Sequence, residues 1–242
     1  MDEIIKLPIS YVGQPIIGEG AISTVIAFPQ NPENIVVKTI DRYFAREFIE
    51  LQKIISKLPP DIRVPEIYYI QPSLTNKTNV YVERINGYEF HKSFESDKKQ
   101  ETYEGFEKEC EILSEISVNE WKIFFSTIEK LPSYDLELDF GSPTNFIVDH
   151  DKKIWFIDLD YKNPQNQYQN SHDSEPDIEN IINLIIISKD LLTKIKQDVS
   201  NSVWQNIENH LITTINKISA ATGIDLSNIK NYIKHIVKYN YI

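Results

Sequence analysis

The sequence predicts an α+β fold with two lobes, a β-rich N-terminal lobe over residues 1–87 and a mostly helical C-terminal lobe over residues 88–242. Two observations lead to this fold class. Before Gly87, short apolar runs alternate with turn residues around one helical stretch; after it, apolar residues recur mostly at helical spacing, with one late hairpin. Strands followed by helices are typical of α+β proteins. The 242 residues are enough for two closely associated lobes.

The N-terminal lobe is predicted to consist of strands and one helix. Its β-prone segments are Gln14–Phe28, which contains a Gly-Glu-Gly turn, then Ile35–Ile40, Glu66–Ile70 and Val80–Arg84. The helical segment has apolar residues at Phe44, Phe48, Leu51, Ile55 and Leu58, and Pro59-Pro60 ends it.

The C-terminal lobe is predicted to be helical apart from one hairpin. Helices are expected over 104–114 and 119–131, the second capped by Asn119 and ended by Pro132. Two apolar strands, 145–148 and 154–157, flank the polar turn 149–153, which is a typical hairpin pattern. Residues 161–176 are polar and predicted to form an exposed loop, and the chain is helical by periodicity from Asp177 onward.

Composition and charge exclude several classes of function. The formal charge of −11 disfavours a general nucleic-acid-binding role, because nucleic acid is bound chiefly through Lys and Arg. The apolar run Ile181–Ile187 is too short to span a bilayer. The N-terminus lacks the features of a secretory signal, so a cytoplasmic location is expected, with delivery into another cell by a signal-independent route left open. A single cysteine, Cys110, excludes an internal disulfide and a cysteine-rich zinc site.

A glycine-containing turn lies between two strand-like stretches, over Gly18-Glu19-Gly20-Ala21-Ile22-Ser23-Thr24-Val25. Glycines let such a turn approach phosphates closely, so that backbone amides can donate to anionic oxygens. A plain turn is the alternative interpretation. Because the stretch does not precede a helix, it fits neither a dinucleotide-binding fingerprint nor a Walker motif.

A lysine interrupts an apolar strand in Ile35-Val36-Val37-Lys38-Thr39-Ile40. Because strand residues alternate between faces, Lys38 points either to solvent or into a cleft. The helix that follows carries Glu47 and Glu50 beside its apolar stripe. A lysine held by such a carboxylate provides a fixed cation for two phosphates.

The predicted hairpin brings oxygen ligands together. Asn145 precedes its first strand and Asp158 ends its second, so both are expected at the same end of the hairpin. The sequence Asp158-Leu159-Asp160 places two carboxylates close together, which a cation or solvent must compensate. Amide and carboxylate oxygens are ligands that Mg²⁺ accepts, usually together with waters and phosphates. The alternative is an ordinary turn after a strand, where Asp and Asn are common.

Taken together and in order, six segments resemble the protein kinase-like superfamily, which also contains the aminoglycoside and choline phosphotransferases. The resemblance covers about residues 12–190. Its segments are similar to the glycine-rich loop (18–25, with Ser23 in place of the third glycine), the lysine strand (35–38), the helix glutamate (Glu47, or Glu50), the hinge (81–87), the metal-binding hairpin (145–160) and the buried aspartate that braces the catalytic loop (Asp177).

The resemblance implies a site for ATP and Mg²⁺. It assigns the phosphates to Gly18, Gly20, Ser23 and Lys38, and the adenine ring to Val25, Val36 and the backbone of the hinge around Glu83. It assigns Glu47 as the partner of Lys38, with Glu50 as the alternative. It assigns the metal to Asn145, Asp158 and Asp160, where Asp-Leu-Asp stands in place of Asp-Phe-Gly. The lysine of one lobe and the metal ligands of the other are expected to meet on one triphosphate.

The sequence departs from the family around the catalytic base. The family's aspartate precedes the asparagine by five residues, which is the position of Phe140 here. Asp139 lies one residue earlier and is the expected base, with Gly141 accommodating the extra residue; Asp135 is a second candidate that needs a longer insertion. Glu137 stands where the family has a histidine, and no arginine precedes Asp139. Control through activation-loop phosphorylation is therefore not expected.

The resulting expectation is an ATP- and Mg²⁺-dependent phosphotransferase. A protein Ser/Thr hydroxyl is favoured as acceptor, because Gly-Glu-Gly followed by Thr-Val is closer to protein kinases, whereas Asp158-Leu159-Asp160 resembles the small-molecule kinases. Three alternatives remain: a small-molecule kinase, an inactive pseudokinase that serves as an interaction module, and a nucleotide site that transfers AMP.

Overall fold

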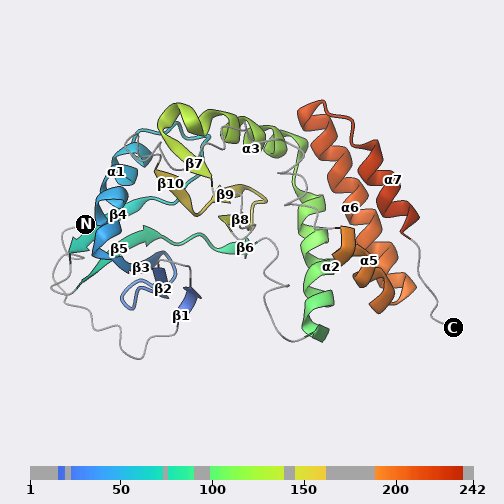
Figure 1. The fold of residues 1–242 in the computed structure, drawn as a ribbon, viewed down its shortest axis with the longest axis horizontal. Coiled ribbons are helices and arrows are strands. Elements are labelled where there is room, and N and C mark those ends of the chain that lie inside the picture. The colour runs from blue at the N-terminus through green and yellow to red at the C-terminus, as the bar shows by residue number, and fades with distance from the viewer. Residues whose placement is uncertain are drawn as a thin grey trace. The chain divides into compact units, whose positions relative to one another are not determined.

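The structure is a computed structural model of the chain, and it describes residues 16–19, 23–72, 76–89, 99–138, 145–161 and 189–236. The described residues form an α+β fold (Figure 1). The chain divides into two compact units, the first comprising Met1–Ser56 and Pro65–Arg84, the second Lys57–Val64 and Ile85–Ile242. The division after Arg84 falls near the boundary expected at Gly87. Residues 57–64, however, group with the second unit, which the sequence did not indicate.

The first unit is built on a five-stranded antiparallel sheet of order β1-β2-β3-β5-β4. Its strands are β1 (Ile16–Glu19), β2 (Ser23–Ala27), β3 (Ile35–Asp41), β4 (Ile67–Pro72) and β5 (Lys77–Glu83). These lie where the β-prone segments predicted them. The central strand β3 is rich in β-branched residues, which pack well on a pleated surface.

Among the described residues of this unit, the α-helix α1 (Ala45–Ile55) accompanies the sheet and follows a 3-10 turn at Arg42–Phe44. It lies within the predicted helical segment, with Leu51 buried. The Gln52 side chain donates to the Ile67 carbonyl oxygen at 2.7 Å, which ties α1 to β4. The helix begins with acidic Glu47 in its first turn and has Lys53 in its last turn, charges that complement the helix dipole.

The two faces of the sheet in the first unit carry different residues. One face holds a cluster of Ile26, Phe28, Ile35, Val37 and Tyr81, on which Tyr68 and Tyr69 pack. Because strand residues alternate, Val36, Lys38 and Ile40 of β3 share the opposite face. The predicted lysine strand therefore contributes Ile35 and Val37 to the apolar cluster and its even-numbered residues to the face that carries Lys38.

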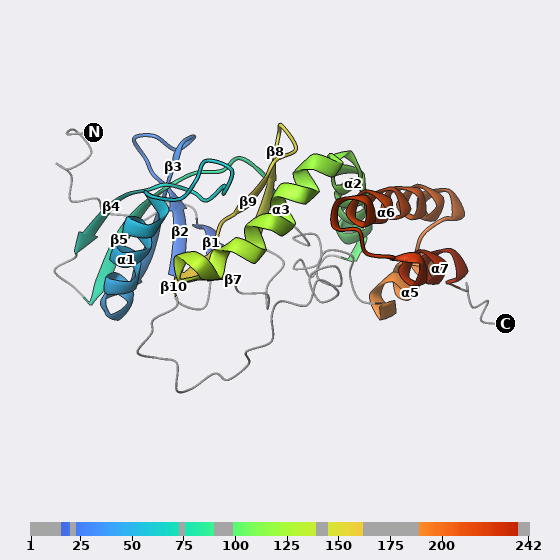
Figure 2. The same cartoon turned by 90° about the horizontal axis from the view of Figure 1, so that it is seen from above.

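The second unit contains the other described α-helices. They are α2 (Lys99–Glu115), α3 (Val118–Lys130), α5 (Lys189–Asp198), α6 (Asn201–Thr222) and α7 (Ser227–His235). α6 packs against α2, α3, α5 and α7 (Figures 1 and 2). Among the described residues, no helix combines the length and apolar character needed to cross a bilayer.

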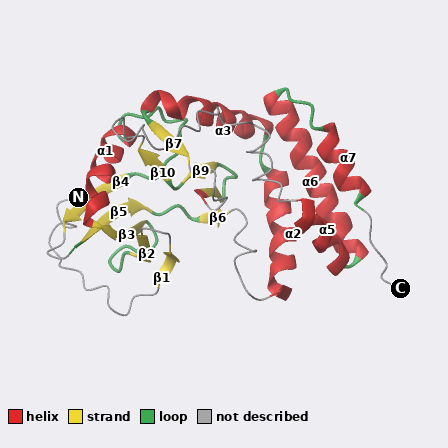
Figure 3. Cartoon of the chain, in the orientation of Figure 1, coloured by secondary structure: helices red, strands yellow, loops and turns green. Residues whose placement is uncertain are grey.

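The second unit also contains two small sheets, visible among the helices in Figure 3. One has the order β6-β8-β9, with β6 (Gly87–Glu89), β8 (Phe146–Asp149) and β9 (Ile154–Phe156). The other pairs β7 (Leu136–Leu138) with β10 (Leu159–Tyr161). The hairpin of β8 and β9 confirms the sequence prediction, whereas β6, β7 and β10 were not predicted.

The cap of α3 differs from the sequence expectation. Ser117, and not Asn119, caps α3: the Ser117 Oγ accepts from the Glu120 N–H at 3.1 Å, and Asn119 lies inside the first turn. In the C-terminal region, the described residues form the helices α5, α6 and α7, where the periodicity predicted helical structure. Gly223, with φ of +76°, ends α6 in a left-handed conformation that glycine adopts without strain.

Candidate functional site

The first unit places Lys38 in the middle of its sheet. Lys38 pairs with Val25 of β2 on one side and with Val80 of β5 on the other. Directly opposed residues of antiparallel strands point to the same face, so these three side chains share a face, which Val36 also joins. The Lys38 side chain is half-buried. The structure thus brings together the predicted lysine and the two predicted adenine contacts, Val25 and Val36.

The predicted glycine turn is described only in part. Gly18 lies in β1 opposite Val25, and Ser23 lies in β2 opposite Ile40. Gly20 falls outside the described residues. Gly18 therefore neighbours the valine that shares a face with Lys38, while the role of the turn itself stays a prediction.

The two candidate glutamates of α1 differ in their contacts. Glu50 forms an ion pair with Lys53 on its own helix, with Nζ and Oε1 at 2.8 Å. Glu47 lies one turn earlier and is half-buried. The choice between Glu47 and Glu50 as the partner of Lys38 stays a prediction.

Glu83, predicted to lie in a hinge, ends β5 and forms a reciprocal contact with Glu66. Its N–H donates to the Glu66 carbonyl oxygen at 2.8 Å, and its carboxylate Oε2 accepts from the Glu66 N–H at 3.1 Å. A ligand bound here would have to use atoms other than the Glu83 N–H. The sequence could not predict this contact, because Glu66 is not adjacent in sequence.

The hairpin of the second unit is anchored by aromatic packing against α3. Phe124 of α3 stacks on Phe156 of β9 at a centroid distance of 5.3 Å, and it meets Phe146 of β8 edge-on at 5.3 Å. Phe146 and Phe156 also contact each other, at 5.5 Å. All three rings are buried. Because Phe146 directly follows Asn145, this packing fixes the backbone at the predicted metal site.

Asn145 and Asp158 lie at the same end of this hairpin. Phe146 pairs with Phe156, and beyond that pair the Ile157 N–H donates to the Asn145 carbonyl oxygen at 2.9 Å. Asp158 follows directly. Asn145 is buried, at 6% exposure, whereas Asp158 is exposed. The hairpin register therefore brings together one buried amide and one solvent-accessible carboxylate, in the arrangement that the sequence predicted.

The candidate base and the third candidate metal ligand lie next to this end of the hairpin in sequence. Asp139 falls outside the described residues, but Leu138 before it pairs with Leu159, which follows Asp158. Asp160 pairs with Glu137 through the backbone of β10 and β7. Asp135, the second candidate base, is exposed and holds a left-handed conformation before β7. The pairing of β7 with β10 thus anchors the chain directly after Asp158 and directly before residue 139.

The oxygen ligands of this site suit a nucleotide-bound cation. Within the described ranges, no group of three or more His, Cys, Asp or Glu side chains is arranged to hold a metal ion. Mg²⁺ is commonly held by one or two carboxylates together with phosphates and waters, so Asn145 and Asp158 fit a Mg²⁺ that arrives with a nucleotide.

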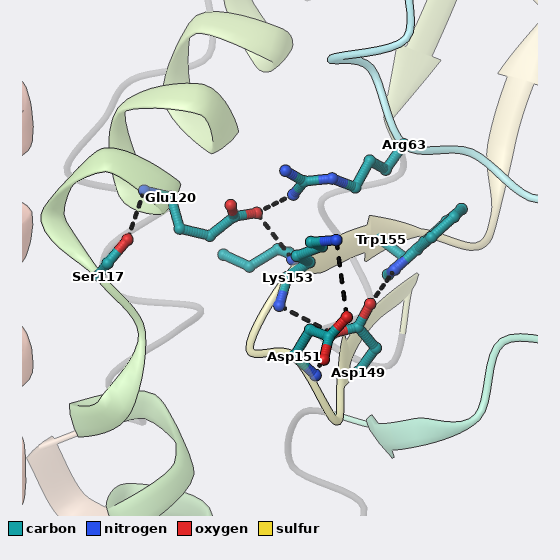
Figure 4. A network of polar contacts seen from close by, with 8 residues as sticks. Arg63, Ser117, Glu120, Asp149, Asp151, Lys153 and Trp155 are labelled. Atoms are coloured by element: carbon teal, nitrogen blue, oxygen red, sulfur yellow. Dashed lines mark hydrogen bonds and ion pairs between the residues drawn. The ribbon is translucent and has the colours of Figure 1, made fainter.

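A polar network that connects α3 and Arg63 to the hairpin was not predicted from the sequence (Figure 4). Glu120 of α3 accepts from the Arg63 guanidinium and, at 2.9 Å, from the Ile154 N–H. Asp149, at the start of the turn, accepts from the Lys153 N–H at 2.9 Å and from the Trp155 indole N–H at 2.8 Å. The Ser117-x-x-Glu120 pattern of a capping box was the one available indication of a special role for Glu120.

The comparisons with known proteins show little about this chain. No protein-family model matches the sequence, and no curated protein matches it. Among solved structures, it is similar to a co-crystal structure of WbdD with the kinase inhibitor LY294002, with a TM-score of 0.41 and 11% sequence identity. The match covers 90% of this chain and 48% of the other, so this chain spans about half the length of that protein. A similarity this distant carries no argument about activity.

Proposed function

We propose that this protein is an ATP- and Mg²⁺-dependent phosphotransferase whose acceptor is a Ser or Thr hydroxyl of a protein. The observation that carries the proposal is the hairpin of β8 and β9. Its register brings the buried Asn145 and the exposed Asp158 to one end. A buried amide oxygen and an accessible carboxylate at one end of a hairpin are the kinds of ligand that a nucleotide-bound Mg²⁺ accepts.

The first unit supports the nucleotide part of the proposal. Lys38, Val25 and Val36 share one sheet face, so one cation stands beside two apolar side chains. An adenine ring needs apolar contacts, and its phosphates need a cation. The proposal assigns Lys38 to the phosphates of the nucleotide, as the sequence resemblance implies.

The proposed chemistry depends on positioning and charge neutralisation. Bound Mg²⁺ supplies positive charge to the phosphates. The Lys38 ammonium would donate to phosphate oxygens, the Asn145 amide oxygen and the Asp158 carboxylate would hold the cation, and the Asp139 carboxylate would accept the proton of the attacking hydroxyl. Phosphoryl transfer needs little covalent participation by the protein. One lysine, two metal ligands and one general base are therefore the types of group that the reaction requires.

A mass-spectrometric transfer assay tests the proposal. The protein is incubated with ATP and Mg²⁺, and the gain of one phosphoryl mass is sought on the protein itself, on a generic protein acceptor and on small alcohols and amines. Phosphorylation of the protein acceptor is expected. Each of Lys38→Ala, Asp158→Ala and Asp139→Asn is expected to lower transfer on the order of 10²-fold or more, with the circular dichroism spectrum unchanged.

The control is Asp151→Asn, which changes an exposed carboxylate in the hairpin turn, at the end of the hairpin opposite Asp158. It should leave transfer within about twofold of the wild type. Phosphorylation of small alcohols alone would indicate a small-molecule kinase, and a gain of AMP mass would indicate a different transfer. Absence of ATP binding would rule out the proposal and leave an interaction module.

A further inference from the structure

The outer edge of strand β9 is closed by side-chain and backbone groups from outside the sheet. β9 is the last strand in the order β6-β8-β9. On its inner side, the Asp149 N–H donates to the Lys153 carbonyl oxygen at 3.0 Å and the Ile157 N–H donates to the Asn145 carbonyl oxygen at 2.9 Å. Since backbone groups alternate in direction along a strand, the N–H groups of Ile154 and Phe156 face outward.

Both outward N–H groups are satisfied by two residues that also bind each other. The Ile154 N–H donates to the Glu120 carboxylate at 2.9 Å, and the Phe156 N–H donates to the Arg63 carbonyl oxygen at 3.0 Å. The Arg63 guanidinium forms an ion pair with the Glu120 oxygen that accepts from Ile154 (Figure 4). Arg63 thus binds the edge strand directly through its backbone and indirectly through Glu120.

This ion pair is withdrawn from water. Glu120 is 7% exposed, and the Arg63 side chain is 16% exposed. In a capping box, a glutamate at this position of a helix binds back to the N-cap residue. Here its Oε1 atom instead accepts from Arg63 and Ile154, and Ser117 alone provides the cap. The carboxylate is therefore used to fix the hairpin rather than to begin the helix.

We propose that Arg63 and Glu120 are positioning residues for Asp158, an inference that rests on the proposed function. The Phe156 N–H held by Arg63 is separated from Asp158 by Ile157 alone, and Ile157 is itself bonded to Asn145. The pair holds β9 at both ends of the strand and so fixes where the chain leaves the hairpin at the metal ligand. Neither residue touches the nucleotide or the metal; they act through the backbone of β9.

The test compares three variants of the full chain with a matched control. Glu120→Gln keeps an acceptor for Ile154 but removes the charge, and Arg63→Gln removes the guanidinium. The double variant Arg63→Met with Glu120→Leu removes both charges and so leaves neither one unpaired. It can therefore be tested even if the single variants do not fold. The control, Lys130→Gln, breaks the exposed ion pair of Lys130 with Asp61, which joins the same segment 57–64 to the same helix α3.

Two readouts separate a positioning role from a merely structural one. Amide hydrogen exchange is measured in peptides that cover Ile154–Asp158 and, for comparison, α6. Affinity for ATP is measured with Mg²⁺ and without it. The variants are expected to exchange at least about tenfold faster in β9 with α6 unchanged. They should lose on the order of tenfold in Mg²⁺-dependent ATP affinity, with little change in Mg²⁺-free affinity. The control should match the wild type in both readouts.

The outcomes distinguish this inference from the function on which it rests. If the wild type shows no Mg²⁺-dependent ATP binding, the proposed function fails and the positioning role falls with it. If the wild type binds Mg²⁺ and ATP but the variants bind them equally well, the positioning role alone is refuted. Unchanged exchange in β9 would refute it as well, because the pair would then not hold the strand. Equal losses with and without Mg²⁺ would also refute it, since they would indicate a general structural effect.

Discussion

At Gly87, a Cβ atom would lie 2.8 Å from the Val148 carbonyl carbon and closer still to its oxygen. Gly87→Ala therefore forces β6 away from β8, and we expect it to lower the free energy of unfolding by about 1–3 kcal/mol. Urea denaturation measures this change. Gly223→Ala is the comparison, because a Cβ there has no atom within 4 Å but the residue has a φ of +76°. That variant should lose about 1 kcal/mol through backbone strain alone. Equal losses at both sites would contradict the packing argument at Gly87.

The thiol of Cys110 provides a pH-dependent prediction at the same scale. Burial raises its pKa well above the ordinary 9.0, and the charges of Glu109 and Glu107 raise it further. Above about pH 9 the unfolded chain releases this proton while the folded protein keeps it, so the free energy of unfolding falls as pH rises. The decrease is at most about 1.4 kcal/mol per pH unit for one group.

Comparison with Cys110→Ala isolates this effect from the titration of other groups. Urea denaturation of both proteins between about pH 7 and about pH 10.5 should show the wild type losing stability faster above about pH 9. Below that pH the two curves should run parallel, offset by the packing lost on substitution. Parallel curves throughout would mean that the thiol titrates normally in the folded protein.

At the scale of elements, the ion pair of Arg63 and Glu120 predicts a strong energetic coupling. Glu120→Ala leaves the half-buried guanidinium and the Ile154 N–H without this acceptor, so we expect a loss of about 3–5 kcal/mol in the free energy of unfolding. Arg63→Ala leaves the carboxylate without its cation at a similar cost. A double-mutant cycle by urea denaturation should give a combined loss well below the sum of the two. Additive losses would show that the two residues act independently.

The elements also show which parts of the fold are predictable from sequence. β3 and α1 have clear periods of two and 3.6 residues, and the hairpin of β8 and β9 has apolar strands around a polar turn. β6, β7 and β10 have three residues each, which is too short for a period to be recognised. Ser117 was overlooked as the cap of α3 because Asn119 is an equally good capping residue by type.

The residues of the candidate site were likewise predictable only where a local sequence pattern indicates their position. Asn145 and Asp158 were predictable because a hairpin register relates them locally, and Lys38 because it interrupts an apolar strand. The role of Arg63 was not predictable, since its contact with Glu120 spans 57 residues and depends on how segment 57–64 folds back. Gly20, Asp139 and Asp177 lie outside the described residues, so their roles stay predictions from the resemblance.

At the scale of the whole molecule, two compact units predict more than one unfolding transition. Trp121, Trp155 and Trp204 all belong to the second unit, so tryptophan fluorescence reports its unfolding alone. The circular dichroism signal includes both units. We therefore expect denaturation curves from the two methods that do not coincide. Tyr68→Trp, which introduces a reporter against the apolar cluster of the first unit, should show the transition that wild-type fluorescence misses. Coincident curves from both proteins would indicate a single cooperative unit.

The assignment of segment 57–64 to the second unit means that the polypeptide passes between the units three times, after Ser56, Val64 and Arg84. No single cut can therefore release either unit intact. A fragment that starts at Ile85 would carry Glu120 but lack Arg63, so its buried carboxylate would have lost its counterion and β9 would have an open edge. Attempts to express the helical part alone should then produce aggregating material, unless the missing peptide is supplied in trans or joined by circular permutation.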